Sequence, residues 1–318
     1  MKEELLDVLV VGSGISGIGA GAHLSMKCPN KKFLILEGRD NFGGTWDLFK
    51  YPGIRSDSDM HTLGFSFKPW TDAKAIADGP SIKSYLKETV DEYDLYPHIL
   101  FDHKVMDYSW SSVSKTWTVS LIEEGREKSL SCNFLMICSG YYNYDKGYTP
   151  HIEGIENYRG TLVHPQHWPK DLEIDNKKIV VIGSGATAMT IVPNVAQQAS
   201  KVTMLQRSPT YVVARPDQDA IANFLRKWLP SKLAYSITRL KNTWLQSFMY
   251  KRMRAKPEEA KRNLIGMTKA ALNKEFDVKK HFTPSYYPWD QRLCLLPNGD
   301  LYDSINQGRV EVITDTID

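Results

Sequence analysis

VVGSGISG at residues 10–17 and VIGSGATA at residues 181–188 repeat one pattern within a single chain. In both stretches an aliphatic, β-branched run passes into a glycine turn, and a segment rich in small residues follows. A buried strand, a tight turn and a helix produce this pattern in dinucleotide-binding β-α-β units. One copy is weak evidence. Two copies predict an α/β protein with two Rossmann-like dinucleotide-binding domains.

Composition and charge restrict the class of protein. The chain has 318 residues, of which 42% are hydrophobic, and its net charge is +3. This length suits about two domains, and so mild a charge gives no reason to expect nucleic acid as a partner. The four cysteines show no C-x-x-C spacing, so we predict no metal site and a reducing, cytoplasmic setting. The N-terminal apolar run is too short for a secretory signal, and no apolar segment reaches the roughly 20 residues that span a bilayer.

The first turn carries Gly12, Gly14 and Gly17. The first glycine allows the bend, the second allows a pyrophosphate to approach the backbone, and the third allows the helix to pack on the strand. The next strand ends at Glu37, whose carboxylate suits ribose hydroxyls and repels a 2′-phosphate. The first unit therefore favours FAD or NAD.

The second turn contains Gly183, Ser184, Gly185, Ala186, Thr187 and Ala188, the accepted variant with alanine at the third position. Its following strand ends at Arg207 and Ser208 instead of an acidic residue. A guanidinium at this point pairs with a phosphate, which favours NADPH over NADH. The alternative is that both turns are structural and bind no ligand.

A chain that binds FAD and NADPH side by side is most simply explained as a hydride relay from nicotinamide to flavin. Disulfide reductases of this architecture place a C-x-x-C sequence against the flavin, and this chain has none. Molecular oxygen remains as the electron acceptor. The residues therefore favour a monooxygenase.

Three further stretches resemble the Baeyer–Villiger family of flavoprotein monooxygenases. YRGTLVHPQHWP at residues 158–169 matches the family fingerprint F-x-G-x-x-x-H-x-x-x-W-[PD], with tyrosine in place of phenylalanine at residue 158. GGTWDLFKYPGIRSDSDMHTLGF, which begins at Gly43, and PWDQRLCLLPNGDL, which begins at Pro288, are also similar to it. Within the family, the chain is most similar to the bacterial ethionamide-activating members.

The resemblance implies roles for individual residues. Arg292 resembles the active-site arginine, and Asp57 resembles the carboxylate that pairs with it beside the flavin; without the resemblance they would be a surface arginine and a turn former. His164 is expected to be a hinge residue rather than a general base, and Trp168 a packing residue. The other residues implied in cofactor binding are Ser16, Gly44, Thr45, Trp46, Asp47, Leu48, Arg55, Ser56 and the backbone of Val105.

The resemblance also implies an activity. Family members insert one atom of O2, by way of a C4a-peroxyflavin, into ketones, or transfer it to thioamide or thioether sulfur. Two alternatives remain open: an N- or S-oxygenating flavin monooxygenase without Baeyer–Villiger activity, and an inactive nucleotide-binding fragment. The second arises because complete members of the family continue beyond residue 318, so that the FAD domain lacks its C-terminal completion here.

We predict five regions. Residues 1–145 form the FAD-binding domain, and 146–177 a linker with the fingerprint. Residues 178–217 begin the NADPH-binding domain, 218–283 are a helical insertion, and 284–318 return to that domain. Within the insertion, residues 226–262 contain eleven Lys and Arg against two Glu, with an apolar stripe. Such a segment either lies on an anionic membrane surface or forms a solvated cover over the substrate site.

Overall fold

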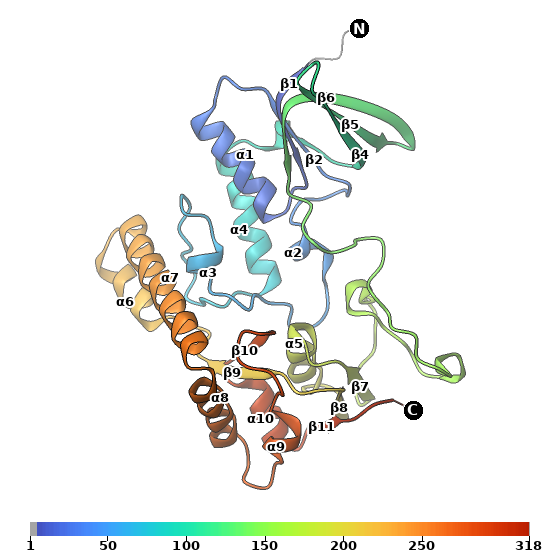
Figure 1. Ribbon diagram of the computed structural model, residues 1–318, viewed down its shortest axis with the longest axis vertical. Helices are drawn as coiled ribbons and strands as arrows, with labels where there is room; N and C mark the ends of the chain where they lie inside the picture. Colours follow the sequence, from blue (N-terminus) through green and yellow to red (C-terminus); the bar gives the residue numbers. More distant parts are fainter. Residues whose placement is uncertain (1–4, 318) are drawn as a thin grey trace. The chain divides into compact units, whose positions relative to one another are not determined.

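The computed structural model describes residues 5–317 (Figure 1). The chain divides into two compact units. The first consists of the residues up to Phe49 together with Gly79–Gly147, and the second consists of Lys50–Asp78 with the residues from Tyr148 onward. One of the two predicted β-α-β motifs lies in each compact unit. The functional boundaries of the domains stay a prediction.

The first unit is built on one sheet of order β3-β2-β1-β6-β5-β4. Its strands are β1 (Leu6–Val11), β2 (Phe33–Leu36), β3 (Ile99–Leu100), β4 (His103–Ser111), β5 (Thr116–Glu123) and β6 (Arg126–Ile137). β1 pairs in parallel with β2 and β6, while β4, β5 and β6 form an antiparallel meander. Because β1, β2 and β6 are parallel, their carboxyl ends lie at one edge of the sheet.

Two helices pack side by side in this unit, α1 (Ile15–Lys27) and α4 (Gly79–Glu92), as Figure 1 shows. A short helix, α2 (Thr45–Leu48), follows Gly43 and Gly44. A fully apolar cluster fills the space between β1, β2 and the meander, with the members Leu6, Leu9, Leu36, Val119, Leu121 and Cys132.

The second unit contains the second glycine turn. A parallel sheet of order β11-β8-β7 holds β7 (Lys178–Ile182), β8 (Lys201–Gln206) and β11 (Val310–Thr314). The helices α5 (Ala186–Val195) and α10 (Asp300–Asn306) pack against each other beside it. A separate parallel pair joins β9 (Tyr211–Arg215) to β10 (Leu293–Pro297). Near the end of the chain, α10 separates β10 from β11.

Helices form the rest of the second unit, namely α3 (Met60–Leu63), α6 (Ala220–Trp228), α7 (Ser231–Ala255), α8 (Pro257–Ala271) and α9 (Val278–His281). α7 packs against α3, where Arg239 donates hydrogen bonds to the carbonyls of His61 (2.9 Å) and Gly64 (2.7 Å). The segment between the two sheets has only the short 3-10 turns Ile155–Asn157 and Pro165–His167. Within residues 5–317 no helix has the length and hydropathy to cross a membrane.

The apolar stripe of α7 faces outward. Its members share one face, as their spacing predicts, and each side chain is at least 41% exposed: Leu233, Ile237, Leu240, Trp244 and Phe248. The opposite face holds the buried residues Tyr235, Thr238 and Asn242, two of which bind the α3 segment through Phe65 and Asp59. A stripe of this kind usually faces a core. In this helix the polar face makes the contacts with the protein.

Candidate functional site

The first glycine turn brings β1, α1 and the end of β6 into close contact. Gly12 has φ of 101°, and a Cβ atom on it would lie 2.6 Å from the Cys138 carbonyl oxygen. A Cβ on Gly17 would lie 1.8 Å from the Gly12 carbonyl oxygen. α1 begins at Ile15, and no side chain caps its N-terminus. The first N–H groups of the helix are therefore free to bind an anion such as a pyrophosphate.

Glu37 lies at the carboxyl end of β2 and is only 5% exposed. Its Oε2 accepts hydrogen bonds from the amide (3.0 Å) and the hydroxyl (2.6 Å) of Ser13, and its Oε1 accepts one from the Arg39 amide (3.2 Å). A buried carboxylate needs such donors. They hold it in a fixed position beside the glycine turn, with lone pairs left for further donors such as ribose hydroxyls.

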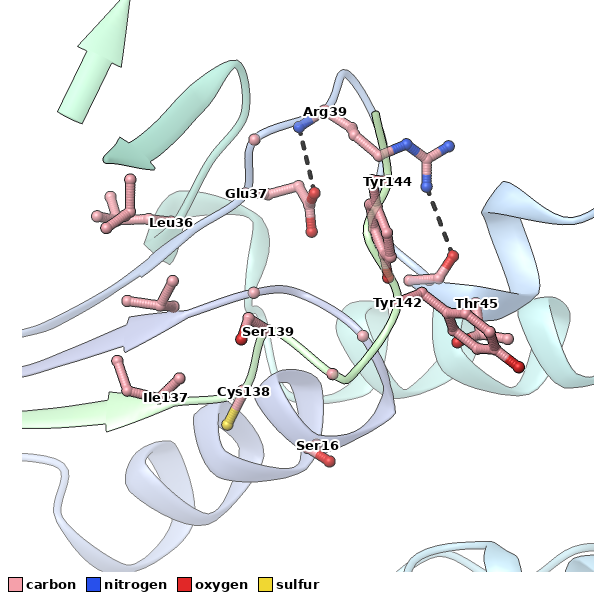
Figure 2. Close-up of a pocket in the computed structure, with 18 of the residues that line it drawn as sticks. Ser16, Leu36, Glu37, Arg39, Thr45, Ile137, Cys138, Ser139, Tyr142 and Tyr144 are labelled. Atoms are coloured by element: carbon pink, nitrogen blue, oxygen red, sulfur yellow. Dashed lines mark hydrogen bonds between the residues drawn. The ribbon is translucent and has the colours of Figure 1, made fainter. Parts of the chain in front are cut away.

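A cavity of about 660 Å³ opens at this edge of the sheet (Figure 2). Eight residues expected at a cofactor site line it: Gly12, Gly14, Ser16, Glu37, Gly44, Thr45, Trp46 and Val105. Gly17, Asp47 and Leu48 do not line it. Gly17 instead makes the packing contact described above. Asp47 is buried and forms ion pairs with Arg39 and Lys83.

Residues that the sequence analysis did not assign also line this cavity. Most of them follow the ends of β2 and β6, namely Arg39, Cys138, Ser139, Tyr142, Tyr144 and Asp145, whereas His103 begins β4. The Arg39 guanidinium lies 5.8 Å from the centre of the Tyr144 ring, and Figure 2 shows the two side chains next to each other. Burial raises the pKa of Tyr144, and the nearby Glu37 charge acts in the same direction. The available signal was their position directly after parallel strands, where α/β proteins bind ligands.

The second glycine turn has the same construction. Gly183 has φ of 136°, and its amide donates to the Leu205 carbonyl (2.8 Å). The hydroxyl of Ser184 donates to the carbonyl of Ser208 (3.2 Å), which ties the turn to the end of β8. α5 begins at Ala186, again without a side-chain cap. The N-terminus of α5 therefore offers a second anion-binding position.

Arg207 follows β8 and is exposed. Within residues 5–317 no carboxylate forms an ion pair with it, so its guanidinium is free to bind a phosphate. Arg292 approaches the same glycine turn: its Nη1 would lie 3.8 Å from a Cβ atom on Gly185. The second unit therefore brings both arginines to the neighbourhood of the turn.

The charges of Arg292 and Asp57 both change the pKa of the buried Cys294 thiol. Burial raises the pKa of Cys294 to about 11, while the Arg292 charge lowers it and the Asp57 charge raises it. Both charges therefore influence the same thiol, and the pairing of Arg292 with Asp57 that the resemblance implies stays a prediction. In the part of the chain that the structure describes, no ion pair joins them directly.

The segment that contains Asp57 packs on α5 and α10. Gly53 adopts φ of 75°, and a Cβ on it would overlap the Asn194 side chain. Arg55 Nη1 pairs with Asp300 at 2.5 Å, whereas its buried Nη2 has no hydrogen-bond partner among the described residues. Arg55 is thus held near the first turn of α10. Ser56 is held by the hydrogen bond from its amide to the Ala77 carbonyl. Both residues were expected at the coenzyme site.

His164 and Trp168 lie in the connecting segment. The His164 Nδ1 accepts a hydrogen bond from the Gln166 amide (3.2 Å), so this ring caps a 3-10 turn. Trp168 is partly buried. A cap is a structural role and agrees with the expectation that His164 is no general base, which stays a prediction.

The chain matches two family descriptions. Residues 60–282 match the flavin-binding monooxygenase-like family, and residues 10–79 match the NAD(P)-binding Rossmann-like domain. Relatives include the FAD-containing monooxygenase EthA of Mycobacterium tuberculosis, 53% identical over 99% of this chain. The probable FAD-binding monooxygenase AlmA of Acinetobacter is 48% identical over 99% of it. The chain spans 65% and 64% of the lengths of these two relatives, respectively.

Solved structures have the same fold. A steroid monooxygenase bound to NADP matches 98% of this chain and 65% of its own, with a TM-score of 0.80 and 23% identity. The OTEMO complex with FAD and NADP matches 98% of this chain and 66% of its own, with a TM-score of 0.78 and 20% identity. The predicted α/β fold with two Rossmann-like units is confirmed, and so is the predicted family. On the match of residues 60–282, this chain is a member of the flavin-binding monooxygenase-like family.

Proposed function

We propose that the protein is an FAD-containing, NADPH-dependent monooxygenase that uses O2 to oxygenate a small ketone or a thioamide or thioether sulfur. The observation that carries the proposal is the pair of uncapped glycine turns with opposite charges at the neighbouring strand ends. Glu37 is acidic and fixed at the first, while Arg207 is basic at the second and forms no ion pair among residues 5–317. This difference suits one coenzyme without a 2′-phosphate and one with it.

The residues of the first unit fit FAD. The cavity has a buried carboxylate for a ribose and an uncapped helix for a pyrophosphate. Gly14 lies in the wall of the cavity, and a Cβ atom on it would lie 3.6 Å from the Gly44 Cα. Because neither glycine has a side chain, this part of the wall stays open. Val105 lies on β4, also lines the cavity and would border the adenine. When bound, the flavin supplies the electrons for reaction with oxygen.

Arg292 and Asp57 have separate parts in the proposed reaction. A fixed guanidinium stabilises negative charge that develops on the transferred oxygen, because a preorganised cation needs little rearrangement. Arg292 also lies at the coenzyme turn, where it would contact bound NADPH. Asp57 would balance this positive charge and help to hold the guanidinium in position.

A visible spectrum of the purified protein tests the proposal directly. A yellow protein whose colour is bleached by NADPH, and which then consumes O2, would support it. A colourless protein that takes up no added FAD would contradict it and support the nucleotide-binding fragment instead. Assays of a cyclic ketone beside a thioether separate Baeyer–Villiger oxidation from N- or S-oxygenation.

Arg207→Gln is expected to weaken NADPH selectively. The substitution removes the cation that would pair with the 2′-phosphate and leaves the glycine turn intact. We expect KM for NADPH to rise about 10- to 100-fold and KM for NADH to change little. Initial rates of flavin reduction over a range of each coenzyme measure both values. Equal effects on NADPH and NADH would show that Arg207 does not select the phosphate.

We further propose that the exposed apolar face of α6 and α7 lies on an anionic membrane surface. Trp228, Leu240 and Trp244 are 75%, 73% and 64% exposed, respectively. Three exposed lysines in the same helices form no ion pair within residues 5–317, namely Lys227, Lys232 and Lys251. Apolar and aromatic residues beside free cations are typical of helices that lie at a lipid interface.

Co-sedimentation with vesicles tests the membrane contact. The protein is expected to bind vesicles that contain phosphatidylglycerol and to bind pure phosphatidylcholine weakly. Replacing the three lysines by glutamine should reduce binding about 10-fold or more, since each cation near an anionic surface contributes about 1 kcal/mol. Tyr148→Ala, at an 87% exposed aromatic outside these helices, is the matched control. Binding that persists without the lysines would contradict the electrostatic contact, whereas a wild-type protein that binds neither kind of vesicle would favour a solvated cover.

A further inference from the structure

The turn that precedes β10 has an unfavourable backbone conformation. Trp289 adopts φ of 71°, and an isolated bridge joins Pro288 to Gln291 around it. The left-handed region is uncommon for a bulky side chain, so the contacts around such a residue must hold it there. The turn leads directly into Arg292. Whatever fixes the turn therefore fixes the backbone of that arginine.

The C-terminal part of α7 makes two of these contacts. Arg254 forms an ion pair with Oδ1 of Asp290, while Oδ2 of the same carboxylate accepts a hydrogen bond from the Tyr287 amide (3.2 Å). Trp289 donates its Nε1–H to the sulfur of Met253 (3.1 Å). One carboxylate thus joins the helix to both ends of the turn.

Two more contacts come from α7 and α8. The Tyr250 ring meets the Trp289 ring edge-on at 5.6 Å. The Tyr287 hydroxyl donates to Glu258 in the first turn of α8 (2.6 Å). Both helices belong to the segment expected as a helical insertion. The insertion therefore holds a turn that lies outside it in the sequence.

Hydroxyl groups hold the other side of the arginine. The Arg292 carbonyl lies 3.2 Å from the Thr210 hydroxyl and 3.4 Å from the Tyr286 hydroxyl, and these two hydroxyls lie 3.0 Å apart. The Tyr211 hydroxyl donates to the Tyr286 carbonyl (2.6 Å). Hydrogen bonds thus hold the main chain before Arg292 and at Arg292.

We propose that α7 and α8 position Arg292 at the second glycine turn by holding the 286–291 turn, with the Arg254–Asp290 ion pair as one of the anchors. The inference rests on the proposed function, because Arg292 has a role only if it meets the coenzyme and the reacting oxygen. In this proposal Asp290 and Arg254 contact neither of these. They are positioning residues that act through the backbone of the turn.

Asp290→Asn tests the anchor, because it removes the charge and keeps the shape. Hydrogen exchange at the Tyr287 and Asp290 amides is expected to become about 10-fold faster, since both amides are bonded within the turn. The dissociation constant for NADP⁺, followed by calorimetric titration, is expected to rise about three- to tenfold. The fraction of oxidised NADPH that yields product should fall, while the rate of flavin reduction at saturating NADPH stays near the wild-type value.

Arg254→Ala should reproduce these effects, and the double variant should be no worse than either single variant. The exchanged pair, Arg254→Asp with Asp290→Arg, should recover part of the lost affinity. Arg252→Ala is the matched control, because it breaks the Arg252–Glu259 pair (3.0 Å), which does not touch the turn. Wild-type hydrogen exchange and NADP⁺ affinity in both single variants would overturn the proposal.

The result is distinguishable from failure of the proposed function. If the wild-type protein takes up neither flavin nor NADP⁺, the proposed function fails, yet hydrogen exchange still reports whether the ion pair holds the turn. If the wild-type protein is active and Asp290→Asn behaves as Arg252→Ala does, only the positioning role fails. Should Asp290→Asn not fold, Arg254→Ala and Tyr287→Phe, which loses the bond to Glu258, provide the same readouts.

Discussion

Arg292→Ala is expected to lower the rate of product formation by about 10²- to 10³-fold, the usual loss when one preorganised electrostatic group is removed from an active site. Reduction of the flavin by NADPH should persist. The physical reason is that hydride transfer needs the two cofactors in contact, whereas oxygen transfer also needs a cation for the developing negative charge. Electrons should then reach O2 without entering the substrate, and hydrogen peroxide should replace the product.

Stopped-flow absorbance measures flavin reduction, and the ratio of hydrogen peroxide to product measures the loss of coupling. Arg292→Lys should recover only part of the activity, because an ammonium lacks the planar fork of donors. Arg262→Ala is a suitable control, since Arg262 is an exposed arginine of the same unit that lies on α8. Unchanged coupling in Arg292→Ala would exclude the arginine from oxygen transfer and leave it a surface residue before β10.

Gly17→Ala is expected to destabilise the first unit by about 3 kcal/mol or more, because a rigid backbone atom occupies the required space. The added Cβ would lie 1.8 Å from the Gly12 carbonyl oxygen and 2.9 Å from its carbonyl carbon. α1 would have to move away from the turn after β1. Cofactor uptake should be lost together with stability, since the N-terminus of α1 forms part of the cavity wall through Ile15 and Ser16.

Gly14→Ala separates folding from binding. The nearest atom to its new Cβ would be 3.6 Å away, which is ordinary van der Waals contact. The stability of the unit should therefore change by less than about 1 kcal/mol. Gly14 lines the cavity, so the methyl group should weaken FAD binding. Urea unfolding with flavin titration of both variants measures the two effects, and equal destabilisation by Gly14→Ala and Gly17→Ala would contradict the packing argument.

Both glycine turns and both strand ends could be predicted because their requirements are local. Gly12 and Gly183 need φ values that other residues avoid, and a β-branched run before a turn predicts a buried strand. Glu37 and Arg207 follow their turns at spacings that the β-α-β unit sets. The stripe on α7 was likewise predictable, since helical periodicity alone puts its members on one face.

Periodicity did not reveal which face of α7 is covered. The polar face binds α3 through Arg239 and Asn242, so the apolar face is exposed. Asp47 gives a similar case. Its sequence neighbours Thr45 and Trp46 line the cavity, whereas its own carboxylate is drawn into ion pairs with Arg39 and Lys83. Lys83 is far from it in the sequence, and no local pattern predicts such a pair.

The sequence by itself determined the two β-α-β units, the family, and the acidic and basic strand ends, because each depends on residues within about 30 positions of one another. Only the tertiary structure decided that Lys50–Asp78 packs in the second unit, that Tyr144 and Arg39 border the cavity, and that α7 holds the turn before Arg292. These contacts join residues that are distant in the chain. They depend on the path of the backbone and on which charged groups pair with each other. The local spacing of residues determines neither.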